Sequence, residues 1–371
     1  MSHTVTGESI TAAQRSLNAA NLDALVLTPG PQLQYLTGLD AAADARFTAL
    51  IVPPKGQTTL IVPRFARPET NFPVADDPGI RVVDYSEAQD PYGLTSRVID
   101  TSLGRRGIRI GLSDETAVVH WHGLLAANPW LELNLASQVL APMQSVKTPA
   151  ELAELTQAAD AIDVVHEQMG RWLVAGRTEA QVAHDITAAL SQQMRPIRVS
   201  VASGQCSANT RHKPTHRQVA HGDVVVVDIA AAMASGYRGQ CARTYVISEM
   251  PLGFAAHYDA VREAYDAALA TAGPGITASA IDAAAKQHLR RTGHNSHFTH
   301  STGYGVGLSE HERPYLMAGD STPLESGMVF TVGPGAFRPG RFGARIQDVV
   351  VCADTGVQRL NALPTSISIL R

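Results

Sequence analysis

The first part of the chain alternates short apolar runs with stretches of helical periodicity. Four apolar runs, at residues 22–28, 49–53, 59–63 and 108–112, have the length of buried strands and are bounded by turn residues. Strands that alternate with helical segments are typical of α/β domains. The pattern therefore predicts a smaller α/β domain over residues 1–143.

Helical periodicity becomes longer in the second part, residues 144–371. Thr148, Pro149 and Glu151 have the spacing of a capping box with proline at the first helical position. Apolar residues recur at helical spacing behind them. The sequence TEAQ at 178–181 begins another helix in the same way, so two helices open the second domain.

A second pair of helices is predicted farther along, at 257–273 and 277–293, and a glycine ends each one. Apolar runs typical of strands lie between and after the two pairs, at 222–232, 242–248, 327–335 and 345–356. The order of helix pair, strands, helix pair and strands predicts an α+β domain with a weak internal repeat.

Composition narrows the class of protein. A chain of 371 residues is long enough for two domains, and 44% apolar with 17% charged residues is typical of a globular protein. The formal net charge of −4, without a basic run, argues against nucleic acid as a partner. No apolar run reaches the ~20 residues of a membrane span.

The cysteine content and the N-terminal residues indicate the cellular compartment of the protein. Three cysteines do not suggest a disulfide framework and fit a reducing environment. The first residues lack the charged and then apolar pattern of a signal peptide. We therefore expect a cytoplasmic protein with no membrane partner.

The stretch HSTGYGVGLSEHERP, residues 300–314, concentrates glycine and polar side chains. It lacks the order of strand, G-x-G-x-x-G and helix that a dinucleotide-binding loop requires. A cysteine in another polar loop, Cys206 of SGQCSAN, has two interpretations, a nucleophilic thiol or a plain loop residue. The second is the simpler one.

Several segments together resemble the pita-bread family of creatinase, prolidase and Xaa-Pro aminopeptidase. They occur in family order and cover nearly the whole chain: PQLQYLTGLD, KTPAELAEL, VASGQCSANTRHKPTHR, GDVVVVDIAAAMASGYRGQCARTYV, HSTGYGVGLSEHERP and GMVFTVGPGAFRPGRFGARIQDVVV. The resemblance implies a creatinase-type N-terminal domain followed by a pita-bread domain, with helix pairs around a curved antiparallel sheet. It also implies a homodimer.

The family's peptidases hold two divalent metal ions with two aspartates, a histidine and two glutamates. The resemblance places these five ligands, in chain order, at Asp228, Gln240, Tyr304, Gly333 and Gln347. Four of the five ligand types are therefore replaced. The interval from Asp228 to Gln240 is one residue longer than the family spacing, which leaves the local register open.

The replacements change the chemistry of the site. Two adjacent divalent ions need bridging carboxylates to offset their charge. An amide is a weak ligand, glycine offers no side-chain ligand, and a phenol with a pKa of about 10 stays protonated at neutral pH. We therefore expect no metal and no other cofactor. The remaining Asp228 is either a catalytic group or a hydrogen-bonded carboxylate on a strand.

Polar residues around the replaced ligands match the family's motifs. His300 and His311 match histidines that contact the substrate or the reacting carbonyl, although two satisfied structural histidines are the alternative. The candidate catalytic residues are Asp228, His212, His300 and His311. The candidate substrate-binding residues are Arg211, Gln240, Tyr304, Glu312, Arg345 and Gln347.

Three functions follow as hypotheses. The first is a metal-free hydrolase that acts on a C–N bond of a small amino-acid-like substrate, with a histidine as general base and polar groups for the oxyanion. Creatine itself is not expected, because creatinase's carboxylates for the guanidinium have no counterparts at Ala242 and Gln347. The second is a catalytically inactive binding protein. The third, a metal-dependent Xaa-Pro peptidase, conflicts with the ligand replacements.

Overall fold

The computed structural model divides the chain into two compact units, Met1–Gln144 and Ser145–Arg371, next to the predicted boundary after residue 143. The structure describes residues 7–41, 44–66, 79–103, 107–294 and 300–371. No helix within these ranges is long and apolar enough to span a membrane.

The first unit is built on a six-stranded sheet in the order β4-β3-β2-β1-β5-β6. Its strands are β1 (Ala24–Leu27), β2 (Ala49–Val52), β3 (Thr58–Pro63), β4 (Ile80–Tyr85), β5 (Ile108–Leu112) and β6 (Leu131–Leu135). The four predicted strands correspond to β1, β2, β3 and β5. The strands β4 and β6 were not predicted, because neither is a continuous apolar run and both contain polar, exposed positions.

Helices cover both faces of this sheet. They are α1 (Gly7–Leu17), α2 (Pro31–Thr37), α3 (Pro91–Leu103), α4 (Val118–Ala127) and α5 (Ser137–Ser145), and a short 3-10 helix, η1, spans Arg64–Ala66. Successive side chains of a strand point to opposite faces. Leu25 of β1 accordingly shares a core with Leu17 of α1, whereas Val26 shares another with Ile99 of α3 and Leu124 of α4. The predicted α/β architecture is confirmed.

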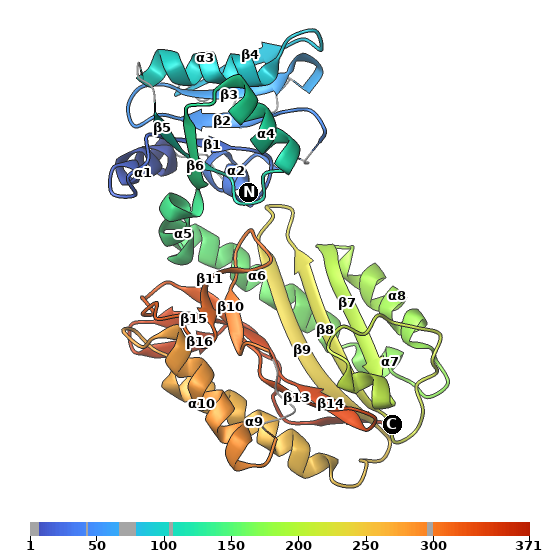
Figure 1. Ribbon diagram of the computed structural model, residues 1–371. Coiled ribbons are helices and arrows are strands. Elements are labelled where there is room, and N and C mark those ends of the chain that lie inside the picture. Colours follow the sequence, from blue (N-terminus) through green and yellow to red (C-terminus); the bar gives the residue numbers. More distant parts are fainter. Residues whose placement is uncertain (1–6, 42–43, 67–78, 104–106, 295–299) are drawn as a thin grey trace. The chain divides into compact units, whose positions relative to one another are not determined.

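The second unit contains the predicted helix pairs (Figure 1). Its helices are α6 (Pro149–His166), α7 (Met169–Trp172), α8 (Glu179–Leu190), α9 (Phe254–Thr271) and α10 (Ala278–Arg291). The capping box of α6 is formed: the Thr148 hydroxyl accepts from the Glu151 amide at 3.3 Å, and the Glu151 carboxylate accepts from the Thr148 amide at 2.8 Å. Thr178 and Gln181 cap α8 in the same way.

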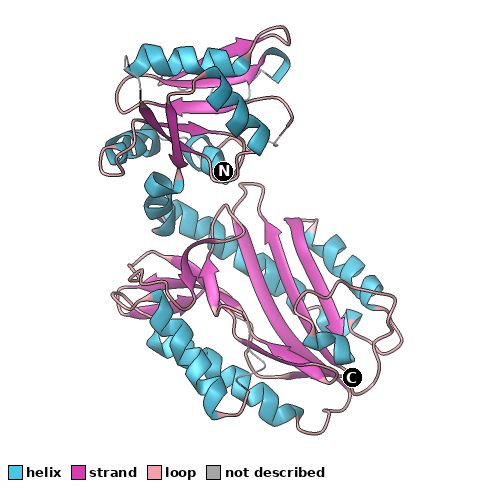
Figure 2. Cartoon of the chain, in the orientation of Figure 1, coloured by secondary structure: helices cyan, strands magenta, loops and turns pink. Residues whose placement is uncertain are grey.

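The strands in the described part of the second unit form three sheets (Figure 2). The first has the order β17-β9-β8-β7, the second β11-β10-β12-β15-β16, and the third is the hairpin of β13 and β14. Their bounds are β7 (Arg195–Ser203), β8 (Val224–Ala232), β9 (Arg238–Ile247), β10 (Gly303–Gly305), β11 (Glu312–Leu316), β12 (Val329–Val332), β13 (Gly335–Arg338), β14 (Phe342–Arg345), β15 (Asp348–Ala353), β16 (Gly356–Arg359) and β17 (Ser368–Leu370).

The apolar run predicted as one strand at 327–335 is divided in the structure. It ends as β12 at Val332 and resumes as β13 at Gly335, because Pro334 lacks the N–H that a continuous ladder needs. β7 was not predicted, since its sequence RPIRVSVAS mixes arginines and serines with apolar residues. A 3-10 helix, η2 (Gly204–Ala208), follows β7.

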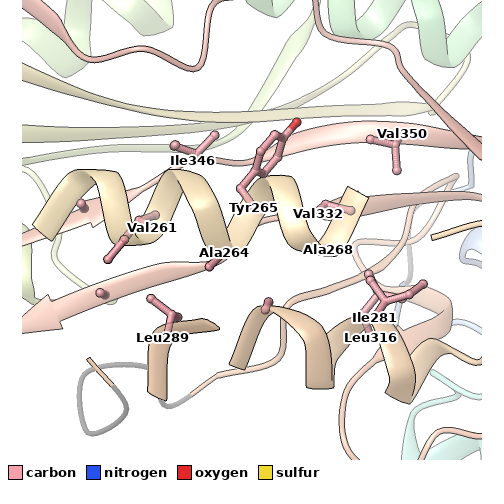
Figure 3. Close-up of a cluster of buried hydrophobic side chains, with 14 of the residues drawn as sticks. Val261, Ala264, Tyr265, Ala268, Ile281, Leu289, Leu316, Val332, Ile346 and Val350 are labelled. Carbon is pink, nitrogen blue, oxygen red and sulfur yellow. The ribbon is translucent and has the colours of Figure 1, made fainter. Parts of the chain in front are cut away.

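Helices hold these sheets through two cores. Ile162 of α6 and Ile186 of α8 pack with Val225 and Val227 of β8. The second core lies where α9 and α10 pack together and against strands of the second sheet. Figure 3 shows Tyr265 of α9 in this core. The predicted α+β class of this unit is confirmed, and the two cores fix the strands that carry the candidate site.

Candidate active site

The register of the central strands brings the candidate residues onto one face. Asp228 of β8 pairs with Ala242 of β9, and Gln240 pairs with Ala230, two positions away. Residues two apart in a strand point to the same face, so Asp228 and Gln240 lie on one face of the hairpin. The two positions that the resemblance assigns to the first and second ligands therefore share a face despite the longer interval between them. An isolated bridge between Ala242 and Gln347 then joins this hairpin to the start of β15.

Three predicted substrate-binding residues form a hydrogen-bonded network. The Tyr304 hydroxyl donates to Gln240 Oε1 at 2.8 Å. Gln347 Nε2 donates to the same oxygen at 2.9 Å. Gln240 and Gln347 are fully buried, and Tyr304 is half-buried. The amide oxygen of Gln240 therefore has two donors, which fixes the orientation of both glutamines.

Asp228 accepts hydrogen bonds from two arginines. Arg345 Nη1 lies 2.7 Å from Asp228 Oδ2, and Arg198 Nη2 lies 3.0 Å from Asp228 Oδ1. Arg345 also donates to Gln347 Oε1, which connects the carboxylate to the amide network. Burial alone would raise the pKa of Asp228, but the guanidiniums of Arg345 and Arg198 outweigh it and lower the pKa. Asp228 is thus an ionised carboxylate with both oxygens engaged.

Arg198 is the site residue that the sequence analysis missed. It lies on β7 beside a bulge between Pro196 and Arg198, and it faces the same side as Ser200, the strand partner of Asp228. Its Nη1 donates to Glu310 at 3.1 Å. The polar alternation of Arg198 and Ser200 just before the SGQC loop is the signal that could have revealed it.

The two family-matched histidines lie at the edge of this network. His300 Nδ1 lies 2.7 Å from the Ser301 carbonyl oxygen. Because a carbonyl only accepts, Nδ1 carries the hydrogen and Nε2 is the basic nitrogen of the neutral ring. Burial, followed by the positive charge of Arg345, lowers the pKa of His300 to about 4. The His311 ring stands edge-on to the Tyr304 ring, with centroids 3.9 Å apart.

The remaining predicted residues have other partners. His212 Nε2 lies 2.7 Å from Glu179 Oε2. The same buried carboxylate accepts from the amides and hydroxyls of Ser203 and Thr215. Arg211 is exposed. This carboxylate fixes the His212 ring on the loop after η2, so the contacts of His212 favour a positioning role over the predicted catalytic one.

Glu312, a predicted substrate-binding residue, has structural partners within the domain. Its carboxylate forms a buried ion pair with Lys147 at 2.7 Å and accepts from the Ser309 amide at 3.0 Å. A side chain on Gly307 would collide with it, at 2.4 Å from a built Cβ. Glu312 therefore closes the glycine-rich loop against Lys147, because a buried ammonium requires an anionic partner.

Comparison with known proteins agrees with this architecture. The sequence model of metallopeptidase family M24 matches residues 153–354, and that of the creatinase/prolidase N-terminal domain matches residues 10–143. The chain belongs to metallopeptidase family M24. Its two units therefore form the creatinase-type N-terminal domain and the pita-bread domain of that family.

Relatives of the M24 chain align over almost its full length. The probable dipeptidase PepE of Mycobacterium tuberculosis is 37% identical over 353 residues, which are 95% of this chain and 93% of the relative. The Xaa-Pro dipeptidase of Lactobacillus delbrueckii is 26% identical over 96% of this chain and 97% of its own. The crystal structure of PepE from Mycobacterium ulcerans superposes with a TM-score of 0.93 at 36% identity, covering 100% of this chain and 98% of that one.

The side chains at the positions that the resemblance assigns to metal ligands do not fit two divalent ions. Only Asp228 carries a carboxylate, and both of its oxygens accept from guanidiniums. At Gly333 the space for a longer side chain is occupied, since a built Cβ would lie 2.8 Å from Cγ of Gln347. Positive guanidiniums and neutral amides surround the one remaining carboxylate, which is the opposite of the anionic donor set that such ions need.

A different group of metal-ligand types lies beside η2. Ligand atoms of Glu179, Cys206 and His212 all lie within 4.8 Å of one another. The Glu179 carboxylate is already saturated by its hydrogen bonds. Burial, followed by the charge of Glu179, raises the pKa of the Cys206 thiol, so a thiolate is disfavoured. These contacts indicate a structural cluster, and they agree with the interpretation of Cys206 as a plain loop cysteine.

Proposed function

We propose that this M24 chain is a metal-independent hydrolase that cleaves a C–N bond of a small amino-acid-like substrate. The observation that carries the proposal is that Asp228, the one carboxylate at the five positions that the resemblance assigns to metal ligands, is bound by Arg198 and Arg345. Guanidiniums supply fixed positive charge without requiring a cluster of carboxylates. The proposal is supported by the connected hydrogen bonds among Asp228, Arg345, Gln347, Gln240 and Tyr304, which are expected of a remade polar site rather than a decayed one.

The proposed mechanism gives His300 the role of general base. Its neutral ring has the basic Nε2 that can take a proton from water as the water oxygen attacks the scissile carbonyl carbon. The same proton then passes to the leaving amine as the C–N bond breaks. A pKa of about 4 keeps this ring neutral at pH 7, although it also limits its basicity. Donor groups of this polar network are the proposed source of stabilisation for the oxyanion.

Dipeptides are the first substrates to consider. Two relatives carry the names probable dipeptidase PepE and Xaa-Pro dipeptidase, and both align with more than nine-tenths of this chain. A dipeptide is also small and amino-acid-like, as the sequence analysis anticipated. The partner that we propose is therefore a small molecule, whose peptide C–N bond is the scissile one.

A second candidate function has its own supporting observation. Because both oxygens of Asp228 accept from arginines, no ionised carboxylate of the network is left to orient a water molecule. A catalytically inactive binding protein would need only the fixed guanidinium donors of Arg198 and Arg345. Turnover decides between the two functions.

The test is dipeptide hydrolysis by protein that has been treated with a chelator. We expect release of free amino acids that neither the chelator nor added Mn²⁺ changes. Loss of a general base typically lowers the rate by about 10²- to 10⁴-fold, which we expect for His300→Gln. His216→Gln, at an exposed position, is the matched control. Saturable binding without hydrolysis would favour the binding protein, and activity that appears only with Mn²⁺ would overturn metal independence.

The family resemblance also supports proposals on assembly and location. We infer a homodimer, for which light scattering at micromolar concentration should give twice the mass of the chain. We also infer a cytoplasmic location, consistent with three cysteines that are all free thiols in the structure. A monomeric mass would contradict the assembly.

A further inference from the structure

The rim of the candidate site contains an ion pair that differs from the buried ones. Arg198 and Glu310 are joined at 3.1 Å, and their side chains are 35% and 45% exposed. The Asp228 side chain, on the inner side of Arg198, is only 9% exposed. One end of the Arg198 guanidinium is therefore fixed inside the site, while the other end faces a partner at the surface.

Arg198 is held in position independently of Glu310. Its Nη2 donates to Asp228. The charge of Asp228 is the largest influence that raises the pKa of Arg198, and Tyr304 contributes as well. Replacing the surface partner would leave these inner contacts in place. Arg198 is thus a pre-positioned cation, because its orientation does not depend on the group bound at Nη1.

Glu310, in contrast, is a replaceable partner. An exposed ion pair contributes only about 0.2–1 kcal/mol, since water solvates both charges when they separate. The backbone oxygen of Glu310 accepts a long hydrogen bond of 3.5 Å from Gln240 Nε2. The next residue, His311, packs on the ring of Tyr304. A competing anion at Arg198 would therefore act directly on the loop that borders the network.

We propose that Nη1 of Arg198 is the subsite for a carboxylate of the substrate, and that Glu310 fills this subsite until the substrate displaces it. The inference rests on the proposed function for the identity of the substrate, and it deepens that function by assigning the group that is recognised. The chemical class is an amino acid or dipeptide with a free carboxylate. Uncharged amides and esters of the same molecules would lack the interaction.

The experiment compares alanyl-proline with alanyl-prolinamide, which differ only in the carboxylate. Isothermal titration of the full chain gives both affinities, and proton NMR in parallel records any hydrolysis. A hydrogen bond to a charged group is worth about 1.5–3 kcal/mol, so we expect the acid to bind roughly tenfold tighter or more. Equal affinities for acid and amide, or no binding of the acid at millimolar concentration, would overturn the proposal.

Glu310→Gln isolates the displacement. Without the internal competitor, the acid should bind about two- to fivefold tighter, which is the equivalent of one exposed ion pair, and the amide should be unaffected. Glu325→Gln removes the same charge at another exposed position and should change neither affinity. Unchanged or weaker binding of the acid by Glu310→Gln would contradict the role of Glu310.

Two substitutions of Arg198 separate the subsite from the stability of the fold. Arg198→Gln should abolish the preference for the acid, whereas Arg198→Lys keeps the charge and should retain part of it. Full preference in Arg198→Gln would overturn the assignment. Acid-selective binding without any hydrolysis would support the subsite while refuting the hydrolase, so the two proposals fail separately.

Discussion

Two carboxylates in the second domain are each bound by two arginines, and they differ in what else those arginines contact. Asp228 is bound by Arg198 and Arg345. Asp348 is fully buried, accepts from Arg243 at 2.6 Å and Arg359 at 2.9 Å, and also accepts from the Tyr265 hydroxyl. Both carboxylates therefore accept charged hydrogen bonds from two guanidiniums.

The surrounding acceptors separate the two clusters. Arg243 also donates to the backbone oxygens of Ala242, Gln347, Leu363 and Pro364. These carbonyls belong to the fold and cannot leave. The outer partner of Arg198 is instead the exposed side chain of Glu310. The comparison teaches that a replaceable partner, rather than the charge of the arginine, distinguishes a candidate ligand site from a structural cluster.

The largest expected effect comes from removing the buried carboxylate. Asp348→Asn leaves Arg243, which is 5% exposed, without its anionic partner. Breaking a buried ion pair in this way typically costs about 3–5 kcal/mol. Urea unfolding should show a decrease of this size, and Asp354→Asn, on the exposed turn after β15, is the control. A decrease below about 1 kcal/mol would show that the cluster around Asp348 is not structural.

The second-largest expected effect is a change of the free energy of unfolding with pH that arises from His166. The charges of Arg243, from the Asp348 cluster, and of Asp228 both act on this histidine. Burial, followed by the charge of Arg243, lowers the pKa of His166 to about 3, whereas Asp228 acts to raise it. The unfolded state, with a pKa near 6.5, then binds more protons than the folded state as the pH falls. This contribution is fully present above about pH 6.5 and is lost below it.

The expected slope is up to about 1.4 kcal/mol per pH unit, or roughly 2 kcal/mol between pH 6.5 and 5. Urea unfolding at a series of pH values measures it. His166→Gln, which keeps a polar group near Tyr245, should flatten the profile in this range. An identical slope in the variant would show that His166 is not the group responsible.

A smaller effect is expected at the candidate site. Asp228→Asn weakens its contacts with Arg198 and Arg345, but Arg198 is partly exposed and keeps Glu310. Solvation of a guanidinium offsets part of the loss, so we expect about 1–2 kcal/mol in the same unfolding assay. A cost equal to that of Asp348→Asn would remove the distinction between the two clusters.

The sequence was sufficient for much of the fold because local signals were strong. Capping boxes at Thr148 and Thr178 and apolar runs such as 59–63 have physical consequences within a few residues. β7 was missed because its identity as a strand depends on pairing with β8, which local sequence does not encode. The break at Pro334 likewise became clear only with the ladder partners of β12 and β13 known.

The candidate site was predictable only in part. The family motifs predicted that Gln240, Tyr304 and Gln347 lie in one site. The structure connects these three side chains by hydrogen bonds. Arg198 lies 30 positions from Asp228, and its contact arises from a bulge and a strand register. Glu312 was assigned from its motif, whereas its ion pair with Lys147 spans 165 positions. Long-range contacts of this kind follow from tertiary packing.

The central claim is that guanidiniums and amides replace the metal ions of the family at this site, and metal content tests it most directly. The purified protein is incubated with Mn²⁺ and then desalted. Elemental analysis should then find well under one metal ion per chain, and a chelator should leave the Tm unchanged. A site occupied at 100 times its Kd would stabilise the fold by about 2.7 kcal/mol, so a true site would be visible in the Tm. Two metal ions per unmodified chain, lost together with stability on chelation, would contradict the account.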